Sequence, residues 1–135
     1  WVYRTAKVYD NAQIRDDALV YDNAEVYENA QIYNEGEVIG KSKVYGWTKV
    51  YDSACIQGRS QISGHAIIHG CAQIYDDVKV YENAEIFGES EIYDKSKIYG
   101  NSRICGSAIV AGKSDICINK DPVIDEGTHI NEKLR

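Results

Sequence analysis

The 135-residue sequence has no methionine, one proline and one phenylalanine, and its apolar residues never form a run near the ~18 residues that a membrane span requires. It also lacks the basic and then apolar start of a secretory signal peptide. These absences predict a cytoplasmic protein that does not bind membranes. Because the missing methionine includes the initiator, we expect a chain that is processed or cut from a longer one.

Cysteines and cations show no pattern of their own. The cysteines, Cys55, Cys71, Cys105 and Cys117, have neither zinc-knuckle nor CxxC spacing, so we expect reduced thiols. The net charge is −6, and only residues 37–72, with four basic and two acidic side chains, are not acidic. No basic stripe is evident, which argues against direct DNA or RNA binding. We expect no metal and no cofactor.

An internal repeat dominates the chain. A β-branched residue recurs every six positions, twenty times without a miss. The series is Val2, Val8, Ile14, Val20, Val26, Ile32, Val38, Val44, Val50, Ile56, Ile62, Ile68, Ile74, Val80, Ile86, Ile92, Ile98, Ile104, Val110 and Ile116. A small residue follows four places after nearly every member. Since a period of six fits neither a helix nor a plain strand, each hexapeptide predicts a short strand and a corner.

The corners carry glycine or asparagine, which tolerate positive φ or cap the turn locally. The asparagines assigned to turns on this ground are Asn11, Asn23, Asn29, Asn83 and Asn101.

The pattern of one aliphatic, three variable, one small and one variable residue resembles the hexapeptide repeat of the left-handed parallel β-helix. The phrases VYDNA, VYENA and IYGNS resemble a bacterial and phage subset of that superfamily, usually described as transferases. The resemblance covers residues 2 to about 130. It implies an all-β fold, a triangular prism of about seven 18-residue coils, and its left hand rests on the resemblance alone.

In such a prism the residue after each inward Val or Ile points outward, and residues 18 apart stack on one face. Face one would carry Tyr3, Tyr21, Ile39, Gln57, Tyr75, Tyr93 and Ala111. Face two would carry Tyr9, Tyr27, Tyr45, Ser63, Tyr81, Tyr99 and Cys117, and face three Arg15, Tyr33, Tyr51, His69, Phe87 and Cys105. These ladders have two compatible interpretations: stabilisation of the faces by stacked rings, or a contact surface for a partner.

One coil, residues 55–72, has no tyrosine on any face. The candidate binding residues gather around it: Tyr45, Trp47, Gln57, Ser63, His65, His69 and Tyr81. Trp47 and His65 are 18 residues apart at a corner otherwise rich in asparagine, so we expect them to be neighbours. The competing interpretation is that this repeat is merely degenerate and that His69 is one more ring in its ladder.

Enzyme activity is the alternative hypothesis, with His65 and His69 as fallback catalytic residues. Acyltransferases of this superfamily typically place a histidine near a loop that protrudes from a coil, and a neighbouring subunit closes the pocket. Here the register is unbroken from Val2 to Ile116, so no loop is inserted. Carbonic anhydrases of the superfamily supply three zinc ligands, whereas His129 lies about three coils from the other two histidines.

The register changes after Ile116, because Ile124 follows eight residues later across the only proline, Pro122. We therefore divide the chain into a hexapeptide-repeat β-helix, residues 1–118, and a C-terminal cap with one further partial coil, residues 119–135. The function predicted is a non-catalytic interaction or structural module. It would present tyrosine ladders and an acidic surface to protein partners or to itself as a homo-oligomer, and a phage-encoded decoy or inhibitor is one form of this hypothesis.

Overall fold

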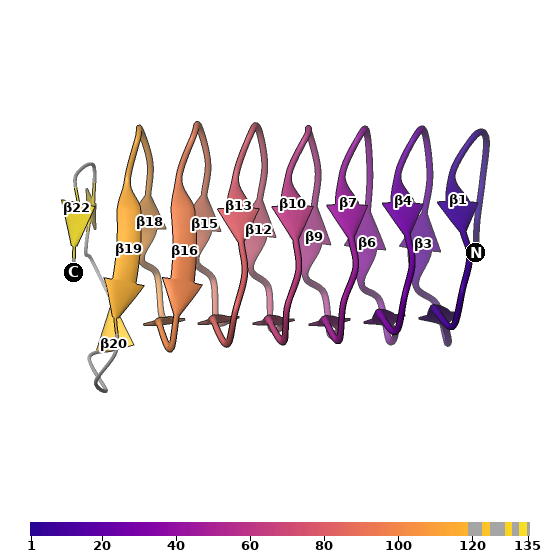
Figure 1. Cartoon of the computed structure of the whole chain (residues 1–135), viewed down its shortest axis with the longest axis horizontal. Coiled ribbons are helices and arrows are strands. Elements are labelled where there is room, and N and C mark those ends of the chain that lie inside the picture. Colours follow the sequence, from indigo (N-terminus) through magenta and orange to yellow (C-terminus); the bar gives the residue numbers. More distant parts are fainter. Residues whose placement is uncertain (119–122, 125–128, 131–132, 135) are drawn as a thin grey trace.

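The chain folds as a three-sided parallel β-helix in the computed structural model, which describes residues 1–118, 123–124, 129–130 and 133–134 (Figure 1). Three parallel sheets form its sides, and the strands of each sheet follow one another at every third position in the chain. The all-β prediction is confirmed, since the described residues contain no helix. Correspondingly, no described segment is a helix that could cross a membrane.

The strands are short and are grouped here by the faces defined above. Face one comprises β3 (Leu19–Val20), β6 (Glu37–Val38), β9 (Cys55–Ile56), β12 (Gln73–Ile74), β15 (Glu91–Ile92), β18 (Ile109–Val110) and β21 (His129–Ile130). Face two comprises β1 (Lys7–Val8), β4 (Glu25–Val26), β7 (Lys43–Val44), β10 (Gln61–Ile62), β13 (Lys79–Val80), β16 (Lys97–Gly100), β19 (Asp115–Ile118) and β22 (Lys133–Leu134). Face three comprises β2 (Gln13–Ile14), β5 (Gln31–Ile32), β8 (Lys49–Val50), β11 (Ile67–Ile68), β14 (Glu85–Ile86), β17 (Arg103–Ile104) and β20 (Val123–Ile124).

The inward residues build the core as predicted. Neighbouring strands pair with an offset of 18 residues, so that Val50, Ile68 and Ile86 lie in one column. Every inward Val or Ile from Val20 to Ile116 is fully buried. From Val2 to Ile116 the strict register spans 114 residues, slightly more than six turns of 18. Apolar burial in these columns is the main force that holds the coils together.

Small residues fill the inside of each corner. The alanines and serines four places after the inward residue are fully or almost fully buried from Ala18 onward. Most of the buried hydroxyls donate to a carbonyl three residues earlier, as in Thr48 to Tyr45 at 2.6 Å and Ser60 to Gln57 at 3.0 Å, whereas Ser42 Oγ has no hydrogen-bond partner among the described residues. A polar atom can therefore be buried here without losing its hydrogen bond.

The corners differ in one respect from the prediction. The asparagines, for example Asn11, lie in the turns, but the residue with positive φ comes one place earlier. That position holds glycine or a charged or polar residue such as Asp10, at φ 57°. Its carboxylate explains the choice: Asp10, Asp16, Asp52, Asp76, Glu82 and Asp94 each accept a hydrogen bond from the backbone N–H 18 residues later. Such a bond offsets part of the strain of a non-glycine residue in this conformation.

The predicted change of register near the C-terminus is confirmed. Ile104 pairs with Ile124 and Val110 with Ile130, an offset of 20 residues, and Ile116 then pairs with Leu134 at an offset of 18. β20, β21 and β22 thus add one strand to each sheet, and the division into a β-helix of residues 1–118 and a cap with a partial coil of residues 119–135 stays a prediction. Pro122 and most of the predicted cap lie outside the described residues.

Candidate functional site

Face two carries an aromatic ladder on its outer surface. Tyr9, Tyr27 and Tyr45 stack with ring centroids 5.0 and 4.9 Å apart and interplanar angles of 2°. Tyr81 and Tyr99 stack at 4.9 Å and 4°. The parallel strands underneath set this spacing, since their separation of about 4.8 Å matches that of the rings. Ser63 separates the two stacks.

Face three carries a second ladder, and it is continuous. Tyr33, Tyr51, His69 and Phe87 stack at 4.8, 4.9 and 5.0 Å with interplanar angles of 5° to 7°. Both ends are covered by guanidinium groups, Arg15 at 5.4 Å from the Tyr33 ring and Arg103 at 5.3 Å from the Phe87 ring. Such cation–π contacts are favourable at the face of an aromatic ring.

Carboxylates engage the ring edge of His69. Its Nε2 lies 3.1 Å from Glu85 Oε1, and its Nδ1 lies 3.8 Å from Asp52 Oδ2. Glu85 also accepts a hydrogen bond of 2.8 Å from Arg103 Nε. With Tyr51 and Phe87 over its two faces, the imidazole is only 21% exposed. The interpretation of His69 as one more ring in its ladder is the one that the geometry favours.

The seven candidate residues lie at four separate places on the prism. Tyr45, Ser63 and Tyr81 lie together on face two, where β10 pairs with both β7 and β13. Trp47 and His65 are exposed one coil apart at the corner between faces two and three. The backbone N–H of Trp47 donates a hydrogen bond to the Gly64 carbonyl oxygen at 2.8 Å. Gln57 lies on face one and His69 on face three. The coil therefore does not bring all seven to one site.

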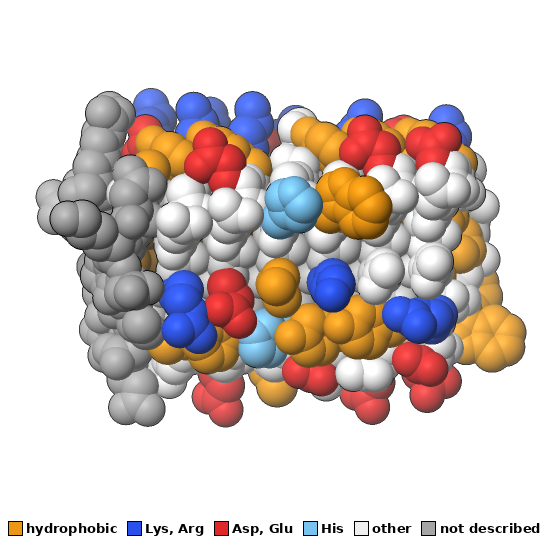
Figure 2. Space-filling model, turned by 60° about the horizontal axis from the view of Figure 1, so that its bottom comes forward, with side chains coloured by type: hydrophobic (Ala, Val, Ile, Leu, Met, Phe, Trp, Pro, Cys, Tyr) orange, Lys and Arg blue, Asp and Glu red, His pale blue; other side chains and the backbone are white. Residues whose placement is uncertain are grey.

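Figure 2 shows histidine side chains on one side of the molecule, each beside hydrophobic side chains. They cannot share one metal ion with a third ligand of the described chain, in which no cluster of three His, Cys, Asp or Glu residues has suitable geometry. Cys55 is also a poor nucleophile, because burial and, secondarily, Glu37 raise the pKa of its thiol to about 11.

Burial also changes the acidity of the ladder tyrosines. The pKa of Tyr27 is raised to about 12, chiefly by desolvation and then by the neighbouring Tyr45 and Tyr9. A phenolate inside a stack of phenols loses water without gaining a cation, so the neutral form is favoured.

We therefore expect a pH dependence of stability to which Tyr27 contributes, together with the other ladder tyrosines whose pKa values burial raises. The pKa of Tyr27 is 10.0 in the unfolded chain and higher in the folded one, so its contribution to stability is complete below pH 10 and is lost as the pH rises to about 12. Urea unfolding between pH 9 and 11.5 would measure this decline. The Tyr27→Phe variant should decline less steeply; an identical slope in both proteins would contradict the assignment.

Sequence reasoning missed a charged edge. Of the twelve lysines and arginines within residues 1–117, nine lie along the corner between faces one and two or on the adjoining column of face two. This basic edge comprises Arg4, Lys7, Lys41, Lys43, Arg59, Lys79, Lys95, Lys97 and Lys113. Six acids share it, Asp22, Glu25, Asp76, Asp77, Asp94 and Asp115, which leaves +3 (nine minus six). The other described columns hold three cations and eleven acids, or −8.

This alignment of cations, in which the acids are interspersed, was not foreseen from the sequence. The cations are far apart in sequence, but steps of 18 residues, as from Lys79 to Lys97 and from Lys95 to Lys113, stack them on neighbouring coils. Figure 2 shows Lys and Arg side chains in a row along its upper margin. The 18-residue step is the signal that would have found the edge. Because acids are interspersed, the exclusion of direct nucleic-acid binding stays a prediction.

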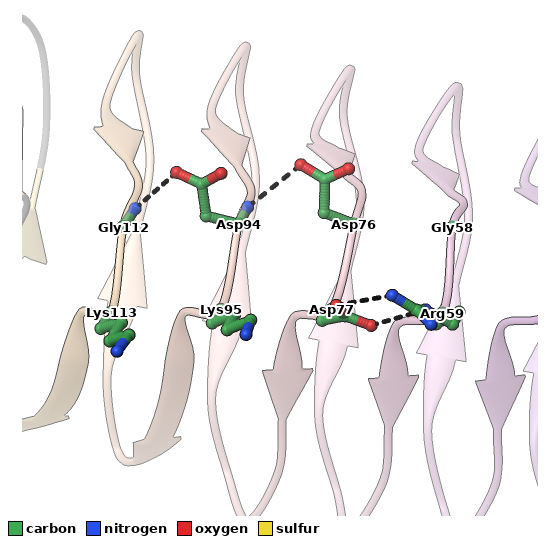
Figure 3. A pocket seen from close by; sticks show the side chains of 8 residues that line it. All are labelled: Gly58, Arg59, Asp76, Asp77, Asp94, Lys95, Gly112 and Lys113. Atoms are coloured by element: carbon green, nitrogen blue, oxygen red, sulfur yellow. Dashed lines mark hydrogen bonds and ion pairs between the residues drawn. The ribbon is translucent and has the colours of Figure 1, made fainter.

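An open groove of about 550 Å³ runs along the edge (Figure 3). Its lining comprises Gly58, Arg59, Asp76, Asp77, Asp94, Lys95, Gly112 and Lys113. Most of its acids are already engaged: Arg59 Nε lies 2.9 Å from Asp77 Oδ1, and Asp94 accepts the Gly112 N–H at 2.8 Å. Lys95 and Lys113 have no ion pair among the described residues, so the groove presents two ammonium groups.

Comparison with known proteins does not place the chain in a family. No protein-family model matches the chain, and no curated protein matches it either.

Proposed function

We propose that this chain is a rigid, non-catalytic protein-binding module whose tyrosine-lined faces dock a protein partner or another copy of itself. The observation that carries the proposal is the outward stacking of Tyr9, Tyr27 and Tyr45, and of Tyr81 and Tyr99, on face two. Held at one spacing by the strands, these rings lose little conformational entropy when a partner covers them.

Charge supports face two as the docking surface. Its outer column of Lys43, Lys79 and Lys97 runs beside the tyrosines, whereas the rest of the described surface is acidic. A partner with carboxylates would approach this face and be repelled elsewhere. Acidic corners of a second copy would meet the same requirement, which is how a homo-oligomer would form. We expect this association in the cytoplasm.

The alternative, an acyltransferase-like enzyme with a site between subunits near His65 and His69, is supported less well. The ring nitrogens of His69 lie beside carboxylates, Nε2 3.1 Å from Glu85 and Nδ1 3.8 Å from Asp52, and the ring is stacked between Tyr51 and Phe87, which leaves a substrate little access to it. His65 is an exposed corner residue on a different column.

The decisive variant replaces Tyr45 and Tyr81 with serine. Both rings lie outside the core, so the free energy of unfolding should fall by only a few tenths to ~1 kcal/mol. Binding should fall by ~2 kcal/mol or more, about thirtyfold, since aromatic anchors dominate interfaces. Self-association would be measured by sedimentation over a range of concentrations, and peptide binding with ligands selected from a displayed random library.

A matched control replaces Tyr75 and Tyr93, the stacked pair of face one, and should leave face-two ligands bound. His69→Ala tests the enzyme alternative in parallel. If it abolishes a measurable acyl transfer from acetyl-coenzyme A, while the Tyr45 and Tyr81 variant associates like the parent, the proposal is lost.

A further inference from the structure

The ladder of face two is missing one ring. Tyr45 is the last ring of the stack that begins at Tyr9, and Tyr81 is the first ring of the stack that ends at Tyr99. Ser63 occupies the ladder position between them. Since β7, β10 and β13 pair without a shift in register, the two rings are separated by two strand spacings, about 9.6 Å. We call the space above Ser63 the ring slot.

Face three shows what fits such an interval. Tyr51 and Phe87 are also two coils apart, and the imidazole of His69 lies between them at 4.9 and 5.0 Å. One planar ring therefore fills the same interval on the same scaffold. On face one two consecutive ladder positions, Ile39 and Gln57, carry no ring, so the gap there is wider than one ring. On face two only Ser63 lies between two rings of the described ladder.

The surroundings of the slot select among planar groups. On one side of Ser63 lies the column Lys43, Gln61 and Lys79, and Lys43 Nζ is 3.5 Å from Glu25 Oε2 while Lys79 has no ion pair among the described residues. On the other side the corner positions are Gly46 and Gly64, which add no side chain, and Glu82 beside Tyr81, whose carboxylate accepts the Gly100 N–H of the next coil at 2.8 Å. The slot is thus open toward the corner and positively charged along its opposite side.

We propose that the ring slot receives one aromatic side chain of a partner protein, carried beside a carboxylate that Lys79 binds. This rests on the proposed function, of which it names the anchor. The inserted ring would stack on Tyr45 and Tyr81 and make the ladder continuous, as His69 does on face three. Arginine guanidinium groups stack on the end rings of face three, but Lys43 and Lys79 would repel a cationic group in the ring slot.

The experiment uses 4-fluorophenylacetate, which joins an aromatic ring to a carboxylate, observed by fluorine NMR. With about eleven non-hydrogen atoms it should bind with a Kd on the order of 1 mM. Ser63→Tyr fills the slot from within and should weaken binding more than tenfold, while Gln57→Tyr on face one should not. Magnetisation transfer should connect the probe with the ring protons of Tyr45 and Tyr81.

The ring-slot proposal would be overturned if the probe bound equally well to Ser63→Tyr. It would also be overturned if magnetisation were transferred only to residues other than Tyr45 and Tyr81. Because Ser63→Tyr introduces the residue found at five other positions of the ladder, we expect it to fold, and its melting temperature checks this. The magnetisation transfer in the wild-type protein tests the slot even if that variant does not fold. The amine analogue 4-fluorobenzylamine should bind more weakly than the carboxylate, and equal or tighter binding would overturn the acidic character of the partner.

The two proposals fail separately. Face-two peptides that bind the wild type and Ser63→Tyr equally well would contradict the ring slot and leave face two as a docking surface. Probe binding at Ser63, without any selected peptide that depends on Tyr45 or Tyr81, would contradict the docking surface and leave the slot as a small-molecule site.

Discussion

Ile68→Asp should unfold the protein. Ile68 is fully buried in the central coil, between Val50 and Ile86 of the neighbouring strands. A carboxylate there would lose its hydration among apolar groups and find no cation, at a cost of several kcal/mol that exceeds half of a typical domain's stability. Each coil contacts only its neighbours, so the defect would also uncouple the two halves of the solenoid. Circular dichroism and thermal unfolding measure the loss.

Ile67→Asp is the matched control, because Ile67 is the adjacent residue of the same strand and points outward between Lys49 and Glu85. It is only half-buried, so we expect a loss of about 1 kcal/mol. If both variants melt at the same temperature, the alternation of inward and outward residues would be incorrect.

The second large effect should come from Gly58→Val. Gly58 has a φ of 76°, and a Cβ at this position would lie 2.6 Å from the backbone nitrogen of Asp76 in the next coil. A β-branched residue is strained at positive φ, and the backbone that it meets cannot move aside without disturbing the coil. Strain and overlap together should lower the free energy of unfolding by about 2–4 kcal/mol, measured by urea denaturation.

Gly58→Asp tests whether a side chain that can hydrogen-bond to the next coil is tolerated better at this corner than an apolar one. Asp76 and Asp94 occupy the same corner column at φ 64° and 63°, and Asp76 accepts the Asp94 N–H at 3.2 Å. The Cβ of this aspartate would meet the same backbone nitrogen at 2.6 Å, but its carboxylate could accept the N–H of Asp76, so we expect a loss about 1 kcal/mol smaller than that of Gly58→Val. Equal tolerance of valine and aspartate would show that positive φ does not limit this corner.

These corner carboxylates connect stability with the proposed function. A docking face is useful only if its rings stay in place when a partner arrives, and the hydrogen bonds from one corner to the next, such as Glu82 to the Gly100 N–H at 2.8 Å, hold successive coils in register. The register in turn fixes the separation of Tyr45 and Tyr81 and hence the width of the ring slot.

The solenoid could be predicted before its coils were seen. The period of six predicted short strands with one inward β-branched residue, and the resemblance to the parallel β-helix implied the 18-residue coil that places Ile68 in its core column and stacks the outward ladders. The sequence also located the break at Ser63 and the change of register after Ile116.

Which of these residues lie close together depends on how the coils stack. Trp47, Gln57 and His69 are close in sequence, yet the corners turn them to different sides of the prism. Lys79 and Lys97, or His69 and Glu85, come together because strand pairing brings residues 16 to 18 positions apart into contact. Local propensity carries no information about such pairs, since their distance depends on the pitch of the coil, and the basic edge and the ring slot are both products of that pitch.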